Sequence, residues 1–579
     1  MTDRLIASPH VSWFQQHGQV HAYHDLFGYL LAMSPDVAEL IEHHRGTPRS
    51  RADADAAFAG RFEAGQLDEF LPVLQLFSCL VAPGAREEDQ LWSMVPVKAR
   101  WVVAHQPSAD HLTFWRTDRA GRSSSESVPA WAARLWASMD GETTLEELVS
   151  RLDPAPARED VERTVACWVH HERQYLRLSK APLSRFGPEH QWPSYLRSSM
   201  PFAPWDPRGP APHDPFAELA VPIAPPHGYY AADVEDPVSQ FEDVETTLSH
   251  LLREPSPLLH GGTYAERVTE ALLERDMIGP GTRKVLEVGA GVGDLAAGVL
   301  GTLRRLRPDV FDGLAYTILD LSPALREAQA ERLARDGLAD RVHWVHGNAE
   351  TLPLRPASVD LVLCNEVIGD FTTVKLTREL LGIEVDDANP PDAPWTRWDD
   401  ALLERLGDAG DLIRRWDLPL DDAPSEFFLN VGALRFLSHV RRVLRPGGAA
   451  FITEYGDLVR YPVASNHLDH LEFSIHFGHM LHVADRIGFE AKVEYVQDLI
   501  GLDREAITLA STRTWFASLR ALFASVGLTL DKRAWTREAL ARLAGDRLNL
   551  DHVSGLRYHP VDERCMGLAP HEFKALMLR

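Results

Sequence analysis

The sequence predicts an α/β fold, with an open and mainly parallel sheet in the C-terminal part of the chain and an α+β, winged-helix-like tandem before it. Three observations carry this prediction. An apolar strand, a glycine-rich turn and the start of a helix follow one another in residues 284–300. Further short apolar runs follow at the spacing of alternating strands and helices. A proline-rich stretch, which suits neither a helix nor a central strand, separates this region from the residues before it.

Composition limits the class of protein. The 579 residues are enough for about two to four domains, and 45% of them are hydrophobic, which excludes a wholly disordered chain. With 59 Lys and Arg against 84 Asp and Glu, the net charge of −25 argues against nucleic-acid binding and suits a basic substrate. Four scattered cysteines exclude a disulfide framework, and the lack of a CxxC pair excludes a zinc ribbon. Without an apolar N-terminal segment or an apolar run of about 18 residues, we expect a cytoplasmic protein with no membrane partner.

The N-terminal part is predicted to form two successive units, 1–95 and 96–180. In the second unit Asp140-Gly141 predicts a turn, and Thr143 or Thr144 can cap the helix that follows it. The first unit follows the same plan more faintly. The second unit is predicted to run through a strand at 100–104, helices at 131–139 and 158–171, and a closing strand at 175–178.

The segment from Asp140-Gly141 through Thr144 to Glu147-Leu148, placed between helices, resembles PqqD-like domains. These domains bind the leader peptides of ribosomally made peptides by adding the peptide as a strand to a sheet edge. The resemblance implies that the partner is a peptide or protein substrate, such as a precursor peptide with a leader. A winged-helix packing or dimerisation module, and with it a homodimer, is the alternative.

Residues 181–237 are predicted to be a proline-rich linker, and residues 238–579 a second large domain. An acidic, tryptophan-containing stretch at 375–425 reads as an insertion after the fourth strand of that domain. Long insertions at this edge of a sheet commonly cover the substrate site, so we expect either a substrate lid or a dimer contact.

The glycine-rich turn is the strongest motif in the chain. Lys284–Val288 is an apolar strand, Gly289–Gly293 has the spacing GxGxG, and a helix opens at Asp294. Glycines at a strand–helix turn let a ligand approach the backbone closely. Because Asp294 stands where a GxGxxG motif has its last glycine, a dinucleotide site is not favoured.

Four more strands are predicted after the glycine turn. The second ends at Asp320, whose carboxylate can accept hydrogen bonds from ribose hydroxyls. The third is followed by Gly347-Asn348-Ala349-Glu350, and the fourth ends at Asn365-Glu366. The predicted strands are 315–320, 342–345, 359–366 and 449–454, the last of them after a turn at 444–448.

This order of elements resembles class I S-adenosylmethionine (SAM)-dependent methyltransferases, and it implies a Rossmann-like sheet and SAM as cofactor. The resemblance places the ribose at Asp320, the adenine near Asn348, Ala349 and Glu350, and the transferred methyl group at the end of the fourth strand. The cofactor-binding residues that it implies are Glu287, Gly289, Ala290, Gly291, Gly293, Asp320, Leu321, Asn348, Ala349, Glu350 and Asn365.

Within this class, short segments resemble the MidA family of protein methyltransferases, whose mitochondrial member dimethylates an arginine. The resemblance spans about residues 225–579 and implies arginine N-methylation. Asp370 lies one position later than in the family pattern, and Glu454 and Glu472 stand where the family has Asp. The segments are Asn365–Asp370, Ser425–Phe428, Glu454–Gly456, Glu472–Phe477, and Met566-Gly567 with Phe573-Lys574.

Acidic side chains follow the predicted strand ends and are candidates for binding a cationic acceptor. Arginine stays protonated and planar, and carboxylates can bind its fork through two hydrogen bonds. The alternative is a solvated acidic rim on an acidic chain. The predicted catalytic residues are Glu366, Asp370, Glu454, Glu472 and His476, with His476 as a base or substrate contact.

No metal motif such as HExxH accompanies the histidines between 467 and 482, so no metal is predicted. The sequence favours a SAM-dependent methyltransferase that modifies a side chain of a ribosomally made precursor peptide, arginine by preference. Two alternatives stay open: O- or N-methylation of a small molecule or a peptide carboxylate, and a non-catalytic MidA-like assembly factor.

Overall fold

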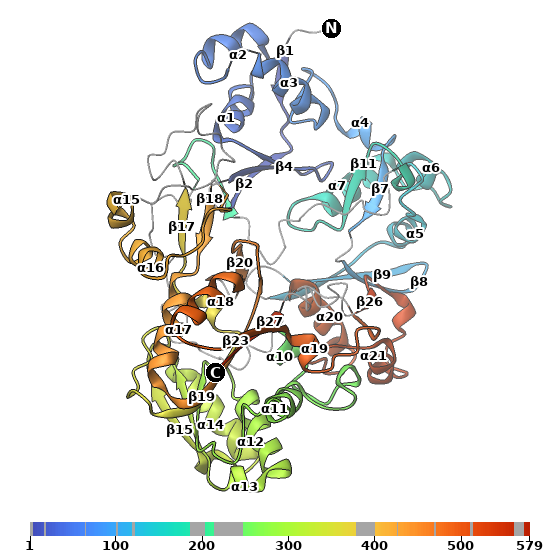
Figure 1. The fold of residues 1–579 in the computed structure, drawn as a ribbon. Coiled ribbons are helices and arrows are strands. Elements are labelled where there is room, and N and C mark those ends of the chain that lie inside the picture. Colours follow the sequence, from blue (N-terminus) through green and yellow to red (C-terminus); the bar gives the residue numbers. More distant parts are fainter. Residues whose placement is uncertain are drawn as a thin grey trace. The chain divides into compact units, whose positions relative to one another are not determined.

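A computed structural model of the chain divides into two compact units, each of which is described by itself (Figure 1). The first unit comprises residues 1–215, 514–530 and 541–556, and the second comprises 216–513, 531–540 and 557–579. The structure describes residues 4–16, 19–63, 65–99, 102–117, 122–185, 203–212, 247–377, 400–424, 426–467, 470–509, 513–560 and 573–579. The predicted linker at 181–237 and the Met566-Gly567 segment lie largely or wholly outside these residues.

The first half of unit 1 is a small meander with helices. Strands β2, β3 and β4 pair antiparallel in this order. Apolar side chains of the strands and the helices pack in one core, which includes Val20 from β3 and Ala38 and Leu40 from α1. The elements are β1 (Arg4–Ala7), β2 (Val11–Gln16), β3 (Gln19–His24), β4 (Leu30–Met33), α1 (Pro35–His43), β5 (Arg49–Ser50), α2 (Arg51–Ala57), α3 (Gln66–Leu76), β6 (Leu80–Val81), α4 (Glu88–Leu91) and, paired with β2, β12 (Ala203–Pro204).

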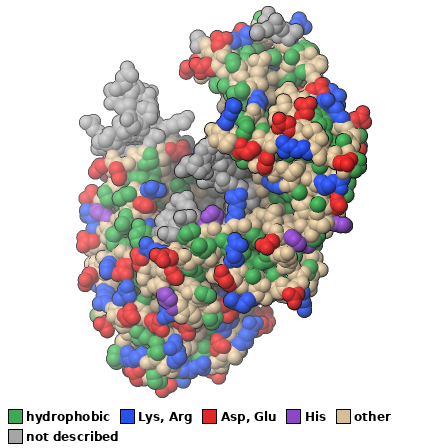
Figure 2. Space-filling model, turned by 90° about the vertical axis from the view of Figure 1, so that its right-hand side faces the viewer, with side chains coloured by type: hydrophobic (Ala, Val, Ile, Leu, Met, Phe, Trp, Pro, Cys, Tyr) green, Lys and Arg blue, Asp and Glu red, His purple; other side chains and the backbone are tan. Residues whose placement is uncertain are grey.

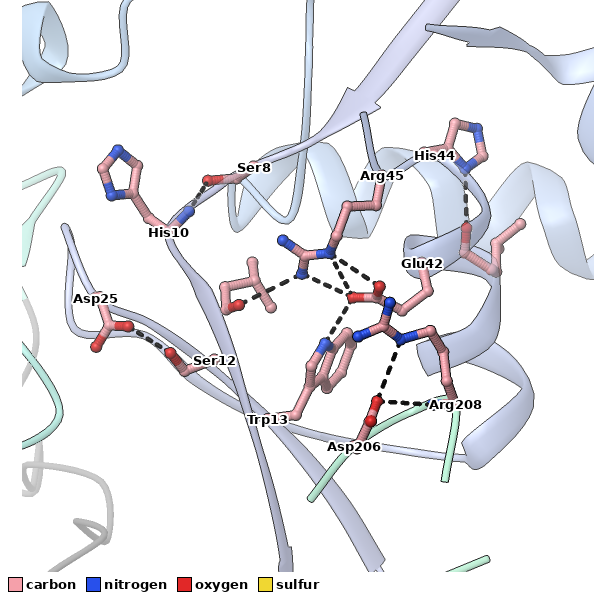
Figure 3. A network of polar contacts seen from close by, with 12 residues as sticks. Ser8, His10, Ser12, Trp13, Asp25, Glu42, His44, Arg45, Asp206 and Arg208 are labelled. Carbon is pink, nitrogen blue, oxygen red and sulfur yellow. Dashed lines mark hydrogen bonds and ion pairs between the residues drawn. The ribbon is translucent and has the colours of Figure 1, made fainter. Parts of the chain in front are cut away.

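A polar contact ties α1 to the meander. Figure 3 shows Trp13 and Arg45 pointing toward the carboxylate of Glu42. The Trp13 indole N–H and the Arg45 Nε both donate to Glu42 Oε1, each at 2.8 Å. One carboxylate on α1 thus binds both a residue of β2 and Arg45, which lies two residues after the end of the helix.

The second half of unit 1 has the predicted elements in the predicted order, and it also contains strands that were not predicted. Thr144 caps α6 by accepting from Glu147 N, as one of the two predicted alternatives. The helix predicted to end at His171 ends at Val169, because His170 adopts ψ 142° and leaves the helix. Strands β9 and β10 were not predicted. The elements are β7 (Val95–Lys98), β8 (Val103–Ser108), β9 (His111–Thr117), β10 (Ser123–Ser127), α5 (Ala130–Ser138), α6 (Leu145–Ser150), α7 (Arg158–Val169), β11 (Leu176–Ser179) and η1 (Leu183–Arg185).

Asp25 joins the two halves of unit 1. One of its oxygens accepts from His171 N at 2.9 Å and from His171 Nδ1 at 2.8 Å, and the other accepts from Ser12 Oγ at 2.5 Å. Ligand-type atoms of Asp25, His170 and His171 all lie within 4.8 Å of one another. The 2.8 Å contact is that of a hydrogen bond, so these contacts explain the cluster as a hydrogen-bonded joint between two loops.

The predicted C-terminal domain 238–579 is not continuous in the structure. Its segments 514–530 and 541–556 belong to unit 1. The reason is strand pairing: β25 (Val553–Ser554) adds antiparallel to β8, opposite His105 and Ala104, and completes the sheet order β10-β9-β8-β25. Such long-range pairing leaves no local signature in the sequence. The helices of this part are α20 (Arg513–Ser525), α21 (Arg537–Ala544) and η5 (Leu550–His552).

Unit 2 contains the predicted Rossmann-like sheet. The strand order is β15-β14-β13-β16-β19-β27-β23, with β22 also paired to β19. Strands β13 to β16 and β19 run parallel, whereas β27 is antiparallel to both of its neighbours. The strands are β13 (Lys284–Val288), β14 (Ala315–Asp320), β15 (Val342–His346), β16 (Val359–Asn365), β19 (Leu444–Asp457), β22 (Ile475–His476), β23 (Ala491–Tyr495) and β27 (Phe573–Leu578).

The sheet is buried on both faces, which accounts for its near-continuous apolar runs. Along β16, Leu361 and Leu363 enter one hydrophobic core, and Val362 and Cys364 enter the other. Residues two apart share a face of a strand, so the two cores lie on opposite sides of the sheet. The helices are α10 (Leu248–Leu251), η2 (Pro257–Leu259), α11 (Tyr264–Glu274), α12 (Asp294–Leu306), α13 (Pro308–Phe311), α14 (Pro323–Arg335), η3 (Ala339–Arg341), η4 (Ile368–Asp370), α17 (Val431–Val443), α18 (Phe477–Arg486) and α19 (Val496–Leu499).

The acidic insertion is closed at its base by two strands. β17 (Val374–Thr377) pairs antiparallel with β18 (Glu426–Leu429), so the chain leaves and re-enters the domain side by side. Between them lie α15 (Asp400–Arg405) and α16 (Asp408–Trp416), while residues 378–399 fall outside the described ranges. Its role as a lid or a dimer contact stays a prediction. Two smaller pairs complete the unit: β20 (Ala464–His467) with β21 (His470–Phe473), and β24 (Ile507–Leu509) with β26 (Tyr558–Pro560).

The negative net charge is spread over the surface. On the face drawn in Figure 2, Asp and Glu side chains are interspersed with Lys and Arg side chains. Charged side chains also form exposed ion pairs, such as Arg158 with Asp89 at 2.7 Å. Among the helices that the structure describes, none combines the length and the apolar character that a membrane span requires.

The packing of α11 on α12 makes a testable prediction. A Cβ at Gly298 would lie 2.2 Å from the Ala265 Cβ, so Gly298→Ala forces these helices apart and should destabilise the protein by about 1–3 kcal/mol. Gly301, on the same helix, is the matched control. In the part of the chain that the structure describes, a Cβ there would meet no atom within 4 Å, so Gly301→Ala should be neutral or stabilise by up to about 1 kcal/mol. Thermal and urea unfolding measure both, and equal effects would contradict the packing argument.

Candidate functional site

The glycine turn follows β13 with the backbone that the motif requires. Gly289 has φ +65° and Gly293 has φ +91°, a region that residues with a side chain avoid. A Cβ at Gly289 would lie 2.6 Å from Val367 Cγ2, and one at Gly293 would lie 3.2 Å from Gln329 Cα. Ala290, between the glycines, is buried and its carbonyl accepts from Gly293 N at 2.8 Å. The turn is therefore packed tightly between Val367, which follows β16, and Gln329 in the middle of α14, and it leads directly into α12.

Asp320 ends β14 beside this turn, and a residue that sequence reasoning missed holds it there. Gln329 Nε2 donates to Asp320 Oδ2 at 2.8 Å and to the Gly291 carbonyl at 3.0 Å, and Gln329 is 0% exposed. One side-chain amide thus fixes both the predicted ribose-binding acid and the middle of the turn. The only signal in the sequence is a polar residue on the buried face of α14. Leu321 follows Asp320, and its carbonyl accepts from His346 Nε2 at 3.0 Å.

Glu287 lies beneath the turn as a buried acid. Its side chain is 1% exposed, and the Tyr316 hydroxyl donates to Oε2 at 2.6 Å. Burial raises the pKa of Glu287 to about 7, the Tyr316 hydrogen bond lowers it, and the nearby charge of Asp320 raises it further. Burial likewise raises the pKa of Asp320, against hydrogen bonds from Ser322 N and Gln329. Burial therefore makes ionisation of both acids costly, and hydrogen bonds offset part of that cost.

The segment after β15 separates into two roles. Asn348 Oδ1 accepts from Glu350 N at 2.8 Å, and Ala349 packs on the core, so both lie at the end of the strand as predicted for an adenine contact. Glu350 turns away into the protein. Its Oε1 accepts from Thr372 N at 2.7 Å and from Thr372 Oγ1 at 2.9 Å. These contacts give Glu350 the structural role of holding the loop after β16.

The end of β16 carries a strained glutamate. Glu366 has φ +56°, a conformation that costs a non-glycine residue about 1–3 kcal/mol. Its N–H donates to the Thr453 carbonyl at 2.9 Å, and its Oε2 accepts from Ser249 Oγ at 3.0 Å. Asn365 is fixed beside it, since its Oδ1 accepts from Tyr264 Oη at 2.7 Å and from Thr453 Oγ1 at 2.8 Å. Strain that is held by surrounding contacts in this way is typical of functional sites.

Three of the predicted acids gather at this edge, and we call Glu366, Glu454 and Glu472 the acidic trio. Asn365 pairs with Thr453 across the parallel strands β16 and β19, so Glu366, which follows the end of β16, lies beside Glu454, which is still within β19. Glu454 is 4% exposed and accepts from Gly369 N and from Tyr455 N, each at 3.0 Å. Burial raises the pKa of Glu454 well above its ordinary value, and the negative charges of Glu472 and Glu366 raise it further. A cation would relieve this repulsion.

Asp370 and His476 are placed differently. Asp370 ends η4, four positions after Glu366, with its N–H donating to the Val367 carbonyl at 3.1 Å. His476 caps α18: its Nδ1 accepts from His479 N at 3.0 Å, and its own N–H donates to Asn430 Oδ1 at 3.1 Å. The two imidazoles stack 3.7 Å apart, and burial lowers the pKa of His476. His476 is therefore a helix cap through Nδ1, and its role as a base or a substrate contact stays a prediction.

Comparisons with known proteins agree with this geometry. The family described as "Putative S-adenosyl-L-methionine-dependent methyltransferase" matches residues 273–483, a range that runs from α11 through the glycine turn and the acidic trio to α18. The ubiquinone/menaquinone biosynthesis C-methyltransferase UbiE of Rhizobium rhizogenes is 36% identical over 77 residues, which are 13% of this chain and 27% of that protein. The counterpart from Allorhizobium ampelinum is 34% identical over 77 residues, with the same shares. The matched segment thus spans about a quarter of the length of these curated relatives.

Two crystal structures from Burkholderia thailandensis belong to the same comparison. One, bound to S-adenosyl-homocysteine, is 19% identical with a TM-score of 0.31, and covers 57% of this chain and 78% of its own. The other, a native structure, is 21% identical with a TM-score of 0.33, and covers 61% and 83%. The family match over residues 273–483 agrees with the predicted enzyme class and with SAM as the cofactor. The resemblance of residues 1–180 to PqqD-like domains stays a prediction.

The buried position of Glu287 predicts a pH dependence of stability. With a folded-state pKa of about 7 against an ordinary 4.5, the folded protein binds more protons than the unfolded chain in this range. Stability is therefore highest below this window and falls as pH rises through 7, by about 3 kcal/mol in all. Glu287→Gln should flatten the fall in melting temperature between about pH 5.5 and about pH 8, relative to the natural chain. Glu331→Gln, at an exposed position on α14, should leave the fall unchanged. Parallel profiles for the natural chain and Glu287→Gln would contradict this assignment.

Proposed function

We propose, from the premise that residues 273–483 form a SAM-dependent methyltransferase domain, that this chain methylates a cationic side chain of a peptide or protein, arginine by preference. The observation that carries the proposal is the acidic trio. It lies at the carboxyl edge of the sheet, where ligands bind in open α/β folds. It also adjoins the cofactor turn, because Val367, next to Glu366, packs against Gly289.

The chemistry of methyl transfer gives the trio a purpose. The reaction is an in-line displacement at the sulfonium methyl, so the acceptor nitrogen must be held close to the methyl and must keep a lone pair. A guanidinium spreads its charge over a planar fork, and carboxylates that bind two of its nitrogens favour the lone pair on the third. Glu454, with its raised pKa, is suited to take the proton that the acceptor loses.

Two other functions make different demands on this edge. Methylation of a small molecule, such as the C-methylation in the name of the matched relatives, needs no acidic trio. A peptide carboxylate would be repelled by it. A non-catalytic assembly factor would need neither the glycine turn nor the hydrogen bonds that Gln329 makes around Asp320. The trio beside an intact cofactor turn therefore favours the cationic acceptor.

Glu366→Gln tests the proposal. The amide keeps the shape of the side chain and removes the negative charge, so methylation of arginine peptides should fall by about 100-fold, as for an interaction made mainly in the transition state. Intact-mass measurement of peptides with and without arginine, incubated with SAM, reads the activity. Calorimetric titration with SAM should show near-natural affinity for Glu366→Gln and a large loss for Asp320→Ala.

The outcomes separate the candidates. A mass shift confined to arginine peptides supports the cationic acceptor. Equal methylation by Glu366→Gln and the natural chain would remove the trio from the mechanism, and methylation of small molecules alone would favour the second candidate. A chain that binds SAM and S-adenosylhomocysteine but modifies nothing would favour the assembly factor.

We further propose that unit 1 holds the peptide at the edge of its sheet, as the resemblance to PqqD-like domains implies. In the order β10-β9-β8-β25, the β8 edge is covered by the chain's own strand β25. Among the described strands, β10 has β9 as its single neighbour, and its Ser123–Ser127 side chains are mostly exposed. An open edge of this kind can accept an added strand through backbone hydrogen bonds.

Proline substitutions in β10 test this binding mode. Successive residues of a strand point their N–H groups to opposite sides, so of Ser124 and Ser125 one faces β9 and the other faces the open edge. Proline removes the N–H group at each position. The variant with the smaller loss of melting temperature is the outward one. It should lose any rate advantage of long peptides over short arginine peptides while it modifies the short ones normally. An outward proline that keeps the advantage would contradict strand addition at β10.

A further inference from the structure

We infer that Ser249 is a positioning residue, which orients the Glu366 carboxylate toward the acceptor. The inference rests on the proposed function, since it concerns how the same site holds its substrate. Ser249 lies on the four-residue helix α10, which precedes the sheet and lies outside the residues matched by the family.

The contact joins distant parts of the chain within unit 2. Ser249 Oγ donates to Glu366 Oε2 at 3.0 Å, and Ser249 N approaches Oε1 at 3.4 Å, across 117 residues. Ser249 thus contacts both oxygens of the Glu366 carboxylate.

The position needs such a contact because the backbone alone does not orient the side chain. The Glu366 backbone is held in its left-handed conformation by the Thr453 carbonyl, but the side chain keeps several rotatable bonds. Glu454 on β19 repels it, since the negative charges of Glu366 and Glu454 act on each other. The charge of Glu366 also reaches Tyr264 on α11, whose pKa burial raises first and this charge raises further. Hydrogen bonds from Ser249 counter this repulsion and favour the ionised carboxylate.

The test compares Ser249→Ala, Ser249→Thr and the control Ser256→Ala in the full chain. Ser249→Ala should lower kcat/KM for an arginine peptide by about tenfold with SAM affinity unchanged, since the lost contact acts on the acceptor side. Its acid limb in the pH profile of kcat/KM should move to higher pH, because the ionised Glu366 has lost a donor. Ser249→Thr keeps the hydroxyl and should restore most of the activity.

Ser256→Ala removes a hydroxyl cap in the same segment, where Ser256 Oγ accepts from Leu258 N at 3.3 Å, without touching Glu366. It should leave the pH profile in place, whatever it does to the melting temperature. Ser249→Ala with a natural kcat/KM and pH profile would overturn the inference and leave the proposed function standing. A natural chain that modifies none of the peptides would overturn the proposed function, and the inference would fall with it.

Discussion

The close approach of the end of β16 to the glycine turn is the constraint on which the site depends. β13 and β16 are parallel neighbours, with Val288 opposite Cys364, so the turn after one and the acidic loop after the other leave the same edge of the sheet. Gly289 lets Val367 pack where a Cβ would lie 2.6 Å from a methyl group. The glycine turn and Glu366 are thereby held in a fixed position relative to each other. Methyl transfer requires such a fixed arrangement, because its geometry tolerates little error.

This arrangement concentrates negative charge, and the structure offsets the cost locally. Each carboxylate accepts hydrogen bonds: Glu287 from the Tyr316 hydroxyl, Glu454 from two backbone N–H groups, and Glu366 from the Ser249 hydroxyl. Hydrogen bonds to charged groups are worth about 1.5–3 kcal/mol each, so they reduce the cost of burial without removing it. Part of the cost of burial therefore remains, and it appears as the raised pKa values of Glu287 and Glu454. The hydrophobic cores on the two faces of the sheet supply the stability that offsets the burial of these acids.

Sequence reasoning recovered the elements that local patterns specify. The strand before the glycine turn, Asp320 at the end of the next strand and the Thr144 cap follow from runs of a few residues, and all three are present. The segment 444–448, predicted as a turn, falls within the long strand β19 as an irregular stretch: the pairing with β16 passes from Leu444 directly to Ala449, and Gly447 has φ +77°. Gln329 and Ser249 were missed, since their partners lie 38 and 117 residues away. The cap that His476 makes for α18 was also missed, and its predicted chemical role stays a prediction.

The sequence by itself determined the fold class of the second unit, the glycine turn and the acids at the ends of β14 and β16, because these depend on spacing along a few consecutive residues. Only the tertiary structure decided which acids meet. Glu366, Glu454 and Glu472 come together because β16 and β19 are neighbours and β21 folds back beside them, whereas Glu350 is drawn off to Thr372. The tertiary structure also returned two C-terminal segments to the first unit through β25. Both outcomes depend on pairing between distant strands, a property of the folded chain that no short stretch of sequence records.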